Sequence, residues 1–227
     1  MEELLAALES SVRAFPLMKR GAESEVRLGT FLGLPAIFKY RLPKPYMHPK
    51  LALSLARQRS VREARVMLKA REVGVPAPRL YALFPSMSLI VMEYIEGETL
   101  KEVAEKDAER AIELGRRAGT IVARLHEAGI AHGDPTTSNF IFSRGELRVI
   151  DFGLAEFTSD VEDFAVDVHL FRRAVESAHA RIAHSMFSSF LEGYAEVRGA
   201  EWVAERAEEI RLRGRYVEER RTVWGRG

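Results

Sequence analysis

The strongest constraint on the fold comes from two polar residues that flank a predicted β-hairpin. The stretch HGDPTTSNF occupies residues 132–140, and the next ten residues read as two short apolar strands joined by a tight Arg-Gly turn. Asn139 stands where this hairpin begins, and Asp151, in the sequence VIDFG, stands where it ends. Because a hairpin returns the chain to its starting point, we expect an amide and a carboxylate at the same end of it.

Asn139 is the more informative of the two residues. It is the only asparagine in 227 residues, which also contain a single glutamine and no cysteine. Scarce amides and thiols together with abundant Glu and Arg are typical of heat-adapted proteins, and a drift in base composition is the alternative explanation. A turn or a helix cap could use Ser, Asp or Gly instead, so the one retained asparagine indicates a specific role.

These residue types have the chemistry that phosphoryl transfer requires. The reaction needs a cation on the phosphates, carboxylates on magnesium and a group that orients the attacking oxygen. Asp134 is placed to orient an attacking hydroxyl or water. Asn139 can offer its side-chain oxygen to Mg²⁺, and Asp151, twelve residues further on, can bridge Mg²⁺ to the β and γ phosphates. A lone DFG is weak evidence, whereas D-x4-N followed closely by a strand that ends in DFG is specific.

The cation is predicted at Lys39. The stretch AIFKY places this lysine inside an otherwise apolar strand, and Glu63 follows 24 residues later in a basic helix. Paired with Glu63, the Lys39 ammonium would be held against the α and β phosphates. One alternative is a strand lysine that faces solvent. Another is a surface ion pair between Glu63 and Arg59, one helical turn away, which would stabilise little.

Other residues are predicted to support this site. His132 is expected to be a packed structural residue and not a base. Asp167, set among apolar residues in AVDVHLF, is expected to anchor the backbone of the loop that carries Asp134. The stretch VMEYIEG reads as a hinge whose backbone groups at Glu93 and Ile95 would bond adenine, with an ordinary strand end as the alternative.

Hydrophobic periodicity predicts an α+β fold with two lobes. The first lobe, residues 1–94, combines five short strands with one main helix; the second, residues 95–212, is mainly helical, and a basic tail covers 213–227. Helices are expected at 2–10, 51–73, 109–128, 162–177, 179–194 and 201–212. Strands are expected at 14–18, 23–32, 34–40, 80–84, 88–94, 140–142 and 147–150.

Composition excludes several classes of protein. With 47% hydrophobic and 30% charged residues, the chain is globular and not disordered. The absence of cysteine excludes disulfides and thiolate zinc sites, which fits a cytoplasmic location. No apolar run approaches the ~20 residues of a membrane helix, and the acidic, amphipathic start is unlike a signal peptide. We therefore expect no membrane association.

The net charge of +1 conceals an uneven distribution. Residues 39–71 contain ten Lys or Arg and one acid, and residues 211–227 contain six Arg and two Glu, whereas residues 93–113 contain eight acids and three basic residues. The two basic segments could attract a polyanion, with ordinary solvated surface as the alternative. The basic tail is expected to dock on a partner.

The order Lys39, Glu63, Asp134, Asn139 and Asp151 resembles that of the protein-kinase fold. Longer stretches narrow the resemblance, namely RLPKPYMHPKLALSLARQRSVREARV, HGDPTTSNF, IDFGLAE, VEDFAVDVHLFRRAVESAH, FLEGY and RLRGR. Together they resemble the small atypical kinase/ATPase of the KEOPS complex over nearly the whole chain. The resemblance implies a serine/threonine kinase and ATPase that uses ATP and Mg²⁺ and phosphorylates itself.

The same resemblance implies partners and a nucleotide-binding loop. Within KEOPS this family supports formation of threonylcarbamoyladenosine in tRNA, so a threonylcarbamoyl-transferase subunit and other KEOPS subunits are expected partners. The basic segments would then fit a contact with tRNA or with an acidic partner. The stretch RGAESEV stands where kinases carry a glycine-rich loop. The residues expected to contact the nucleotide there are Gly21, Ala22, Glu23 and Ser24.

Two departures from protein kinases bear on the substrate. Pro135 stands where Leu is common, and proline disfavours a helical backbone at Asp134. The spacer between Asp151 and Glu162 is short and no Ala-Pro-Glu element follows, so a kinase acting on extended peptides is not expected. A phosphotransferase for a small molecule, such as an aminoglycoside or choline, and a non-catalytic scaffold with this fold remain as alternatives.

Overall fold

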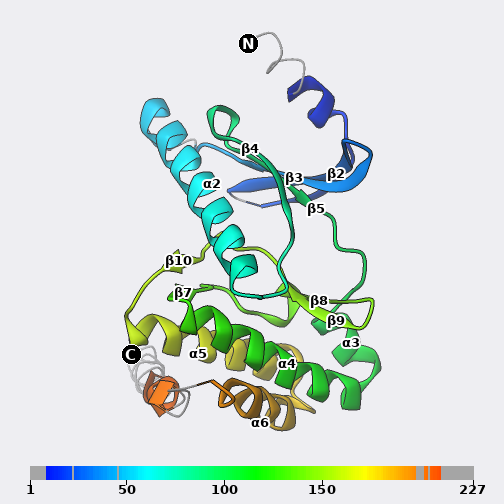
Figure 1. The fold of residues 1–227 in the computed structure, drawn as a ribbon, viewed down its shortest axis with the longest axis vertical. Coiled ribbons are helices and arrows are strands. Elements are labelled where there is room, and N and C mark those ends of the chain that lie inside the picture. The colour runs from blue at the N-terminus through cyan, green and yellow to red at the C-terminus, as the bar shows by residue number, and fades with distance from the viewer. Residues whose placement is uncertain (1–8, 22, 45, 198–201, 204, 211–227) are drawn as a thin grey trace, which may run out of the picture. The chain divides into compact units, whose positions relative to one another are not determined.

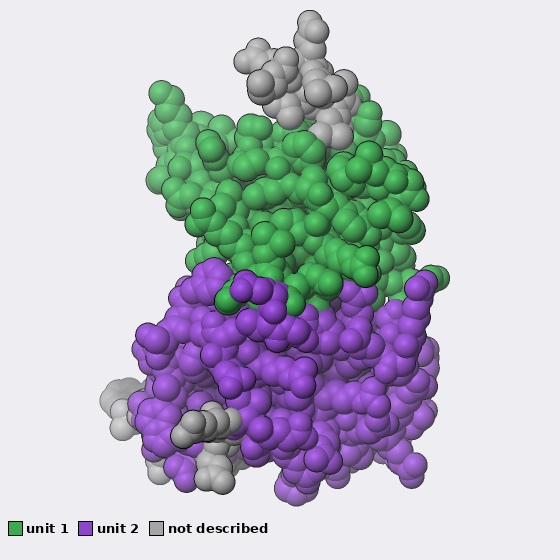
Figure 2. All heavy atoms as spheres, in the orientation of Figure 1, with its two compact units in different colours: residues 1–71, 77–96 green, residues 72–76, 97–227 purple. Residues whose placement is uncertain are grey.

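The structure is a computed structural model that describes residues 9–21, 23–44, 46–197, 202–203 and 205–210 (Figure 1). The chain divides into two compact units, which Figure 2 draws in different colours. Unit 1 consists of residues 1–71 and 77–96, and unit 2 consists of residues 72–76 and 97–227. The predicted contacts of Ala22 and of the tail at 213–227 lie outside the described residues.

Unit 1 is built on an antiparallel five-stranded sheet in the order β1-β2-β3-β5-β4. Its strands are β1 (Leu17–Arg20), β2 (Ser24–Phe31), β3 (Leu34–Arg41), β4 (Leu80–Phe84) and β5 (Leu89–Glu93). Five strands were predicted here, and four of them lie within two residues of the predicted positions. Strands β3 and β5 contribute most of an apolar core of buried residues, which are Val12, Ala36, Phe38, Tyr40, Leu89 and Val91.

The first strand lies about three residues later than predicted. Residues 9–13 are helical, and the Ala14 amide still donates to the Ser10 and Ser11 carbonyls, so this part of the chain belongs to the end of a helix. Phe15 then packs its ring against Phe38, with ring centroids 5.0 Å apart. Because the helix end and the partly buried Phe15 take up residues 9–15, the strand begins only at Leu17.

One main helix, α2 (Pro49–Glu72), packs in unit 1, as predicted for residues 51–73. Proline at the first helical position suits a helix start, because its missing amide hydrogen would have no partner there. The buried side of α2 is mostly small, with alanines at 52, 56, 64 and 70. Ser60 on the same side donates its hydroxyl to the Ser88 carbonyl at 3.1 Å, which ties the helix to the start of β5.

Unit 2 is mainly helical, as predicted. Its long helices are α4 (Ala108–Glu127), α5 (Val161–Ala178) and α6 (Ala183–Tyr194), and residues 202–203 and 205–210 are helical as well. Aspartate caps begin two of them, because the Asp107 side chain accepts from the Arg110 amide and the Asp160 side chain from the Glu162 amide. Helix α6 begins four residues later than predicted, since the turn at His179–Ile182 separates it from α5.

The predicted hairpin is present as β8 (Phe140–Ser143) and β9 (Glu146–Val149), with Ser143 paired to Glu146. Arg144 and Gly145 adopt φ of 51° and 86°, the left-handed conformation that a two-residue hairpin turn requires. A short strand, β6 (Glu98–Thr99), extends this sheet in the order β6-β8-β9. The hairpin therefore has the turn that the Arg-Gly dipeptide predicted.

Several short elements were not predicted. They are α3 (Leu100–Lys106), β6, β7 (Ile130–Ala131), β10 (Glu156–Phe157) and the 3-10 turns η1 (Pro85–Met87) and η2 (Thr137–Asn139). Helix α3 begins with a capping box, in which the Thr99 hydroxyl accepts from the Glu102 amide and the Glu102 carboxylate accepts from the Thr99 amide. Within the described part of the chain, none of the helices combines the length and apolarity needed to cross a membrane.

Glycines allow α4 and α6 to approach closely. A Cβ added at Gly119 on α4 would lie 1.9 Å from the Phe190 carbonyl oxygen, and one added at Gly193 on α6 would lie 1.9 Å from the Arg116 carbonyl oxygen. These atoms belong to backbone and cannot rotate away. The contact between the two helices therefore depends on the absence of a side chain at both positions.

We expect Gly119→Ala to lower the stability of the protein. The new methyl group must push α4 and α6 apart, and overpacking of this kind costs about 1–3 kcal/mol. In a chain of this size the melting temperature should fall by roughly 2–4 °C for each kcal/mol lost. Gly21→Ala is the control for thermal denaturation, because the nearest atom to its added Cβ is 3.8 Å away. Equal melting temperatures for the two variants would contradict the helix contact.

Candidate active site

The loop before the hairpin brings Asp134 and Asn139 together. The side-chain nitrogen of Asn139 donates to the Asp134 carbonyl at 2.8 Å and to its carboxylate at 2.9 Å. Asn139 is buried, and its backbone carbonyl accepts from the Ile150 amide at 2.8 Å. This last bond joins the two ends of the hairpin next to Asp151, so the three predicted polar residues belong to one small region of unit 2.

Asp151 has a strained backbone. Its φ of 63° is in the left-handed region, which a non-glycine residue adopts at a cost of about 1–3 kcal/mol. The Gly153 amide donates to its carboxylate at 3.2 Å, and the next side chain, Phe152, is buried against His132 with ring centroids 5.2 Å apart. The buried ring fixes the backbone, and this leaves the Asp151 carboxylate on the exposed side of the chain.

Asp167 anchors the loop, as predicted. Its buried carboxylate accepts from the backbone amides of His132 at 2.5 Å and Gly133 at 2.7 Å. His132 is fully buried, and its Nε2 lies 3.2 Å from the Ile150 carbonyl, which confirms that it is a packing residue. Gly133 has a φ of 79°, and an added Cβ there would lie 2.6 Å from the Leu154 carbonyl oxygen.

Two residues that the sequence analysis did not single out extend this anchor. His126, near the end of α4, places its Nε2 3.0 Å from the Asp167 carboxylate and its Nδ1 2.6 Å from the Tyr194 hydroxyl on α6. Burial lowers the pKa of His126, with the Asp167 carboxylate acting in the opposite direction. Burial also raises the pKa of Tyr194, so its hydroxyl remains a donor. Position 126 continues the apolar face of the predicted helix, and this is the signal that could have identified it.

Unit 1 contains the predicted ion pair between Lys39 and Glu63. The Lys39 ammonium lies 2.6 Å from a Glu63 oxygen, and the two side chains are 7% and 1% exposed. Lys39 therefore does not face solvent. Arg59 is not the partner of Glu63 either, because its guanidinium pairs with Glu23.

Arg41 also binds Glu63 and was not predicted. Its guanidinium nitrogen Nη2 lies 2.6 Å from the second Glu63 oxygen, and the Arg41 side chain is 5% exposed. Residues two apart on a strand share a face of the sheet, so Arg41 follows Lys39 on the same side of β3. A second cation two positions after a strand lysine is the signal that could have revealed it.

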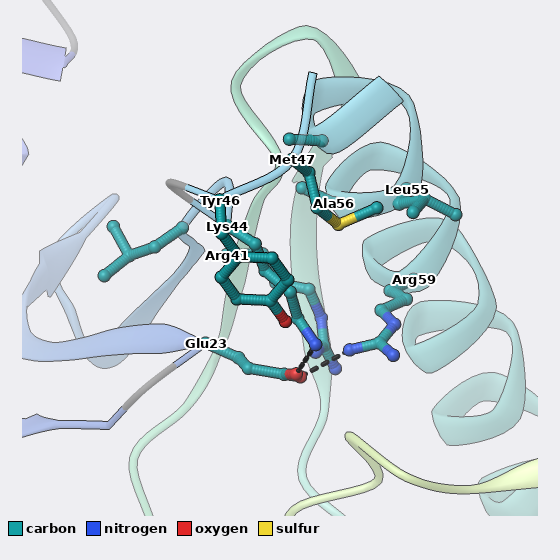
Figure 3. Close-up of a pocket in the computed structure, with 10 residues that line it drawn as sticks. Glu23, Arg41, Lys44, Tyr46, Met47, Leu55, Ala56 and Arg59 are labelled. Carbon is teal, nitrogen blue, oxygen red and sulfur yellow. Dashed lines mark hydrogen bonds and ion pairs between the residues drawn. The ribbon is translucent and has the colours of Figure 1, made fainter. Parts of the chain in front are cut away.

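Hydrogen bonds and ion pairs of Glu23 stabilise the predicted nucleotide loop. The Gly21 amide donates to the Ser24 carbonyl at 2.8 Å, and the Leu42 amide donates to the Glu23 carbonyl at 2.9 Å. The Glu23 carboxylate pairs with Lys44 at 2.5 Å and with Arg59 (Figure 3). The hydrogen bond from Lys44 lowers the pKa of Glu23.

A pocket of about 320 Å³ lies beside this ion pair in unit 1. Figure 3 shows the Glu23, Lys44 and Arg59 charges meeting at one end, with the apolar side chains of Met47 and, from α2, Leu55 and Ala56 toward the other end. The lining residues are Glu23, Arg41, Leu42, Lys44, Tyr46, Met47, Ala52, Leu55, Ala56 and Arg59.

The predicted hinge residues lie at the end of β5. The Glu93 amide donates to the Arg79 carbonyl at 2.9 Å, and its carboxylate accepts from the Arg79 amide at 3.0 Å. An adenine contact at Glu93 would therefore rest on its carbonyl oxygen. Ile95 follows two residues later and is buried.

The donor atoms of unit 2 suit a hard cation. Across the residues that the structure describes, no three or more His, Cys, Asp or Glu side chains form a group that could hold a metal ion by itself. Asn139 points both of its donor hydrogens at Asp134, which makes its side-chain oxygen the atom for a cation. Mg²⁺ is commonly held by one or two protein oxygens together with phosphates and water, so Asn139 and Asp151 fit it.

This combination of elements defines a protein-kinase-like fold. The crystal structure of the Rio2 kinase from Chaetomium thermophilum in an ADP/Mg²⁺-phosphoaspartate complex matches 92% of this chain and 75% of that chain, with a TM-score of 0.60 and 16% identity. The RIO domain family matches residues 40–165. The chain belongs to this family and, within it, to the group of KEOPS complex subunit Bud32.

Three relatives support that assignment. KEOPS complex subunit Bud32 of Pyrococcus abyssi is 43% identical over 212 residues, which cover 89% of this chain and 96% of the relative. A probable serine/threonine-protein kinase BUD32 homolog of Archaeoglobus fulgidus is 40% identical, covering 87% and 95%. A probable bifunctional tRNA threonylcarbamoyladenosine biosynthesis protein of Methanothermobacter thermautotrophicus is 37% identical, covering 89% of this chain but 37% of the relative.

We expect the buried His126 to make the protein less stable in mild acid. Its pKa is lower in the folded chain than the ordinary value near 6.5, so below that pH the unfolded chain binds the proton more readily. Stability should fall from pH 7 to pH 5, by at most about 1.4 kcal/mol per pH unit from this group. His126→Gln should flatten the curve in urea denaturation, since other histidines contribute equally to both proteins. Parallel curves for the two would contradict the assignment.

Proposed function

We propose that this protein is a magnesium-dependent ATPase and atypical serine/threonine kinase that serves as the kinase subunit of a KEOPS complex. The observation that carries the proposal is the bonding of Asn139. The single asparagine of the chain donates twice to Asp134, and its carbonyl accepts from the amide next to Asp151. Three groups with the chemistry of phosphoryl transfer are therefore held by one network in unit 2.

In this proposal each residue has a separate task. Lys39, held by Glu63, contacts phosphate oxygens of ATP, and Asp134 orients the attacking hydroxyl or water. Asn139 and Asp151 would hold Mg²⁺, which when bound neutralises phosphate charge. The backbone of the loop at Gly21–Ser24 would cover the phosphates, and the backbone at Glu93 and Ile95 would bind adenine.

The names of the relatives support the assignment to KEOPS. A Bud32 subunit aligns with this chain over nearly its full length. The bifunctional threonylcarbamoyladenosine biosynthesis protein matches over only 37% of its own length, so most of that relative lies outside the matched region. The name of that relative joins two functions in one chain, which supports an association of a Bud32-like part with a second functional part here as well. We propose the threonylcarbamoyl-transferase subunit as the direct partner, within a cytoplasmic complex that also binds tRNA.

Asn139→Ala and Asp151→Ala should each reduce magnesium-ATP turnover by ~100-fold or more, because each removes an oxygen that helps neutralise charge in the transition state. Steady-state ATP hydrolysis with the purified chain is the measurement. Glu146→Gln, an exposed carboxylate on the same hairpin, is the control and should retain normal turnover. Near-normal rates in either alanine variant would refute the metal assignment.

Asp134→Asn separates an enzyme from a scaffold. The amide can keep the hydrogen bond to Asn139 but is a poor proton acceptor, so turnover should fall by roughly 100-fold or more with little change in fold. If wild type and variant share the same background rate, the non-catalytic alternative is correct.

Affinity purification tests the partner. The tagged chain, incubated in a lysate of a heat-adapted archaeon, should recover the threonylcarbamoyl-transferase subunit, identified by mass spectrometry. The matched control is the tag alone. Recovery of nothing, combined with transfer of phosphate to an aminoglycoside or to choline, would favour the small-molecule alternative.

A further inference from the structure

The buried ion pair of unit 1 contains one more cation than a lysine–glutamate pair requires. One oxygen of the Glu63 carboxylate binds Lys39 and the other binds Arg41, each at 2.6 Å. All three side chains are at least 93% buried, since their exposed fractions are 7%, 1% and 5%. Two cations therefore share the Glu63 carboxylate away from water.

Stability alone is a weak reason for this arrangement. Removing an arginine from water is costly, and apolar residues of similar volume often stabilise a protein as well as or better than a buried ion pair does. Arg41 lines a pocket together with Ala52, Leu55 and Ala56 of α2, so an apolar residue would fit this environment at position 41. The buried Arg41 is better explained by a role in the reaction than by a role in holding unit 1 together.

Arg41 and Lys39 differ in how firmly they can hold Glu63. A guanidinium is planar and rigid, whereas a lysine ammonium is a point charge on a flexible stem. The backbone around Arg41 is also fixed, because its amide donates to the Ser88 carbonyl at 3.0 Å, and that same carbonyl accepts from Ser60 on α2. Arg41 is thus attached to a rigid part of the sheet next to the helix that carries Glu63.

We propose that Arg41 is a positioning residue for phosphoryl transfer, which rests on the proposed function above. Arg41 binds one oxygen of Glu63 and so fixes the orientation of the carboxylate. The other oxygen then directs the Lys39 ammonium toward the phosphates. Arg41 acts through Glu63 and does not itself contact the substrate.

A double-mutant cycle between positions 41 and 63 tests this inference. Arg41→Gln should lower kcat/KM for ATP hydrolysis by about tenfold or more, and Glu63→Gln by a similar or larger factor. If Arg41 acts through Glu63, the double variant should be no worse than Glu63→Gln alone, since residues that work as a unit are not additive. Arg41→Lys, which keeps the charge without the planar fork, should recover part of the loss.

A second measurement does not depend on turnover. Calorimetric titration with a non-hydrolysable ATP analogue and Mg²⁺ should give weaker binding for Arg41→Gln, with no further weakening when that change is added to Glu63→Gln. Arg13→Gln is the control, because this exposed arginine of unit 1 pairs with Glu9 on the surface. Thermal denaturation of every variant shows whether it is folded.

The outcomes separate this inference from the proposed function. Additive losses in the cycle would mean that Arg41 contacts the nucleotide directly or acts only on the fold, and either result overturns it. Normal kcat/KM and binding in Arg41→Gln, with Glu63→Gln impaired, would overturn it while leaving the proposed function intact. A lower melting temperature of Arg41→Gln with an unchanged kcat/KM per folded molecule would also overturn the positioning role of Arg41. A wild-type chain that neither binds nor hydrolyses ATP would refute the proposed function and, with it, this inference.

Discussion

The geometry of unit 2 depends on the buried carboxylate of Asp167. It accepts from two consecutive backbone amides, those of His132 and Gly133, and lies 3.0 Å from the His126 ring. His132 is buried and Gly133 partly buried, and a buried amide without a hydrogen-bond partner costs about 1–3 kcal/mol. Because His126 is part of α4 and bonds Tyr194 on α6, the helical scaffold fixes the start of the loop on which Asp134 and Asn139 lie.

Strain and packing balance each other along this segment. Gly133 and Asp151 both adopt a positive φ, at 79° and 63°, and for Asp151 this conformation is unfavourable. The backbone tolerates it because Phe152, the next residue, is buried against His132. The exposed carboxylate therefore obtains its position from the packing of its apolar neighbour, so changes to the core around Phe152 should act on Asp151 without contacting it.

The sequence predicted the parts of the site that depend on neighbours along the chain. The Arg-Gly turn fixed the hairpin, and the order of polar residues indicated Asn139 and Asp151 at its ends. The Lys39–Glu63 pair was predicted from charge, since Glu63 is the only acid of a basic segment. Arg41, His126 and Tyr194 were missed, and so was α3. The spacing of Arg41 from Lys39 and the place of His126 on the apolar face of its helix were local signals. Their partners could not be predicted, because the contacts with Glu63 and Tyr194 join elements that are far apart in the sequence.

The basic segment at 39–71 acquires a different meaning once its side chains are placed. Lys39 and Arg41 are buried on Glu63, and Lys44 and Arg59 neutralise Glu23. Four of its ten cations are therefore engaged within unit 1, at Glu63 or at Glu23.

Polyanion binding would depend on the remaining basic residues. Each phosphate neutralised contributes about −0.9 to the slope of log affinity against log salt for a duplex, so counting all ten cations would overstate the salt dependence of a tRNA contact. The exposed cations of α2, such as Lys50, Arg57 and Arg65, are the ones that such a contact would use, and they lie outside the cluster around Glu63. Nucleotide chemistry and polyanion binding in unit 1 would therefore draw on separate sets of basic residues.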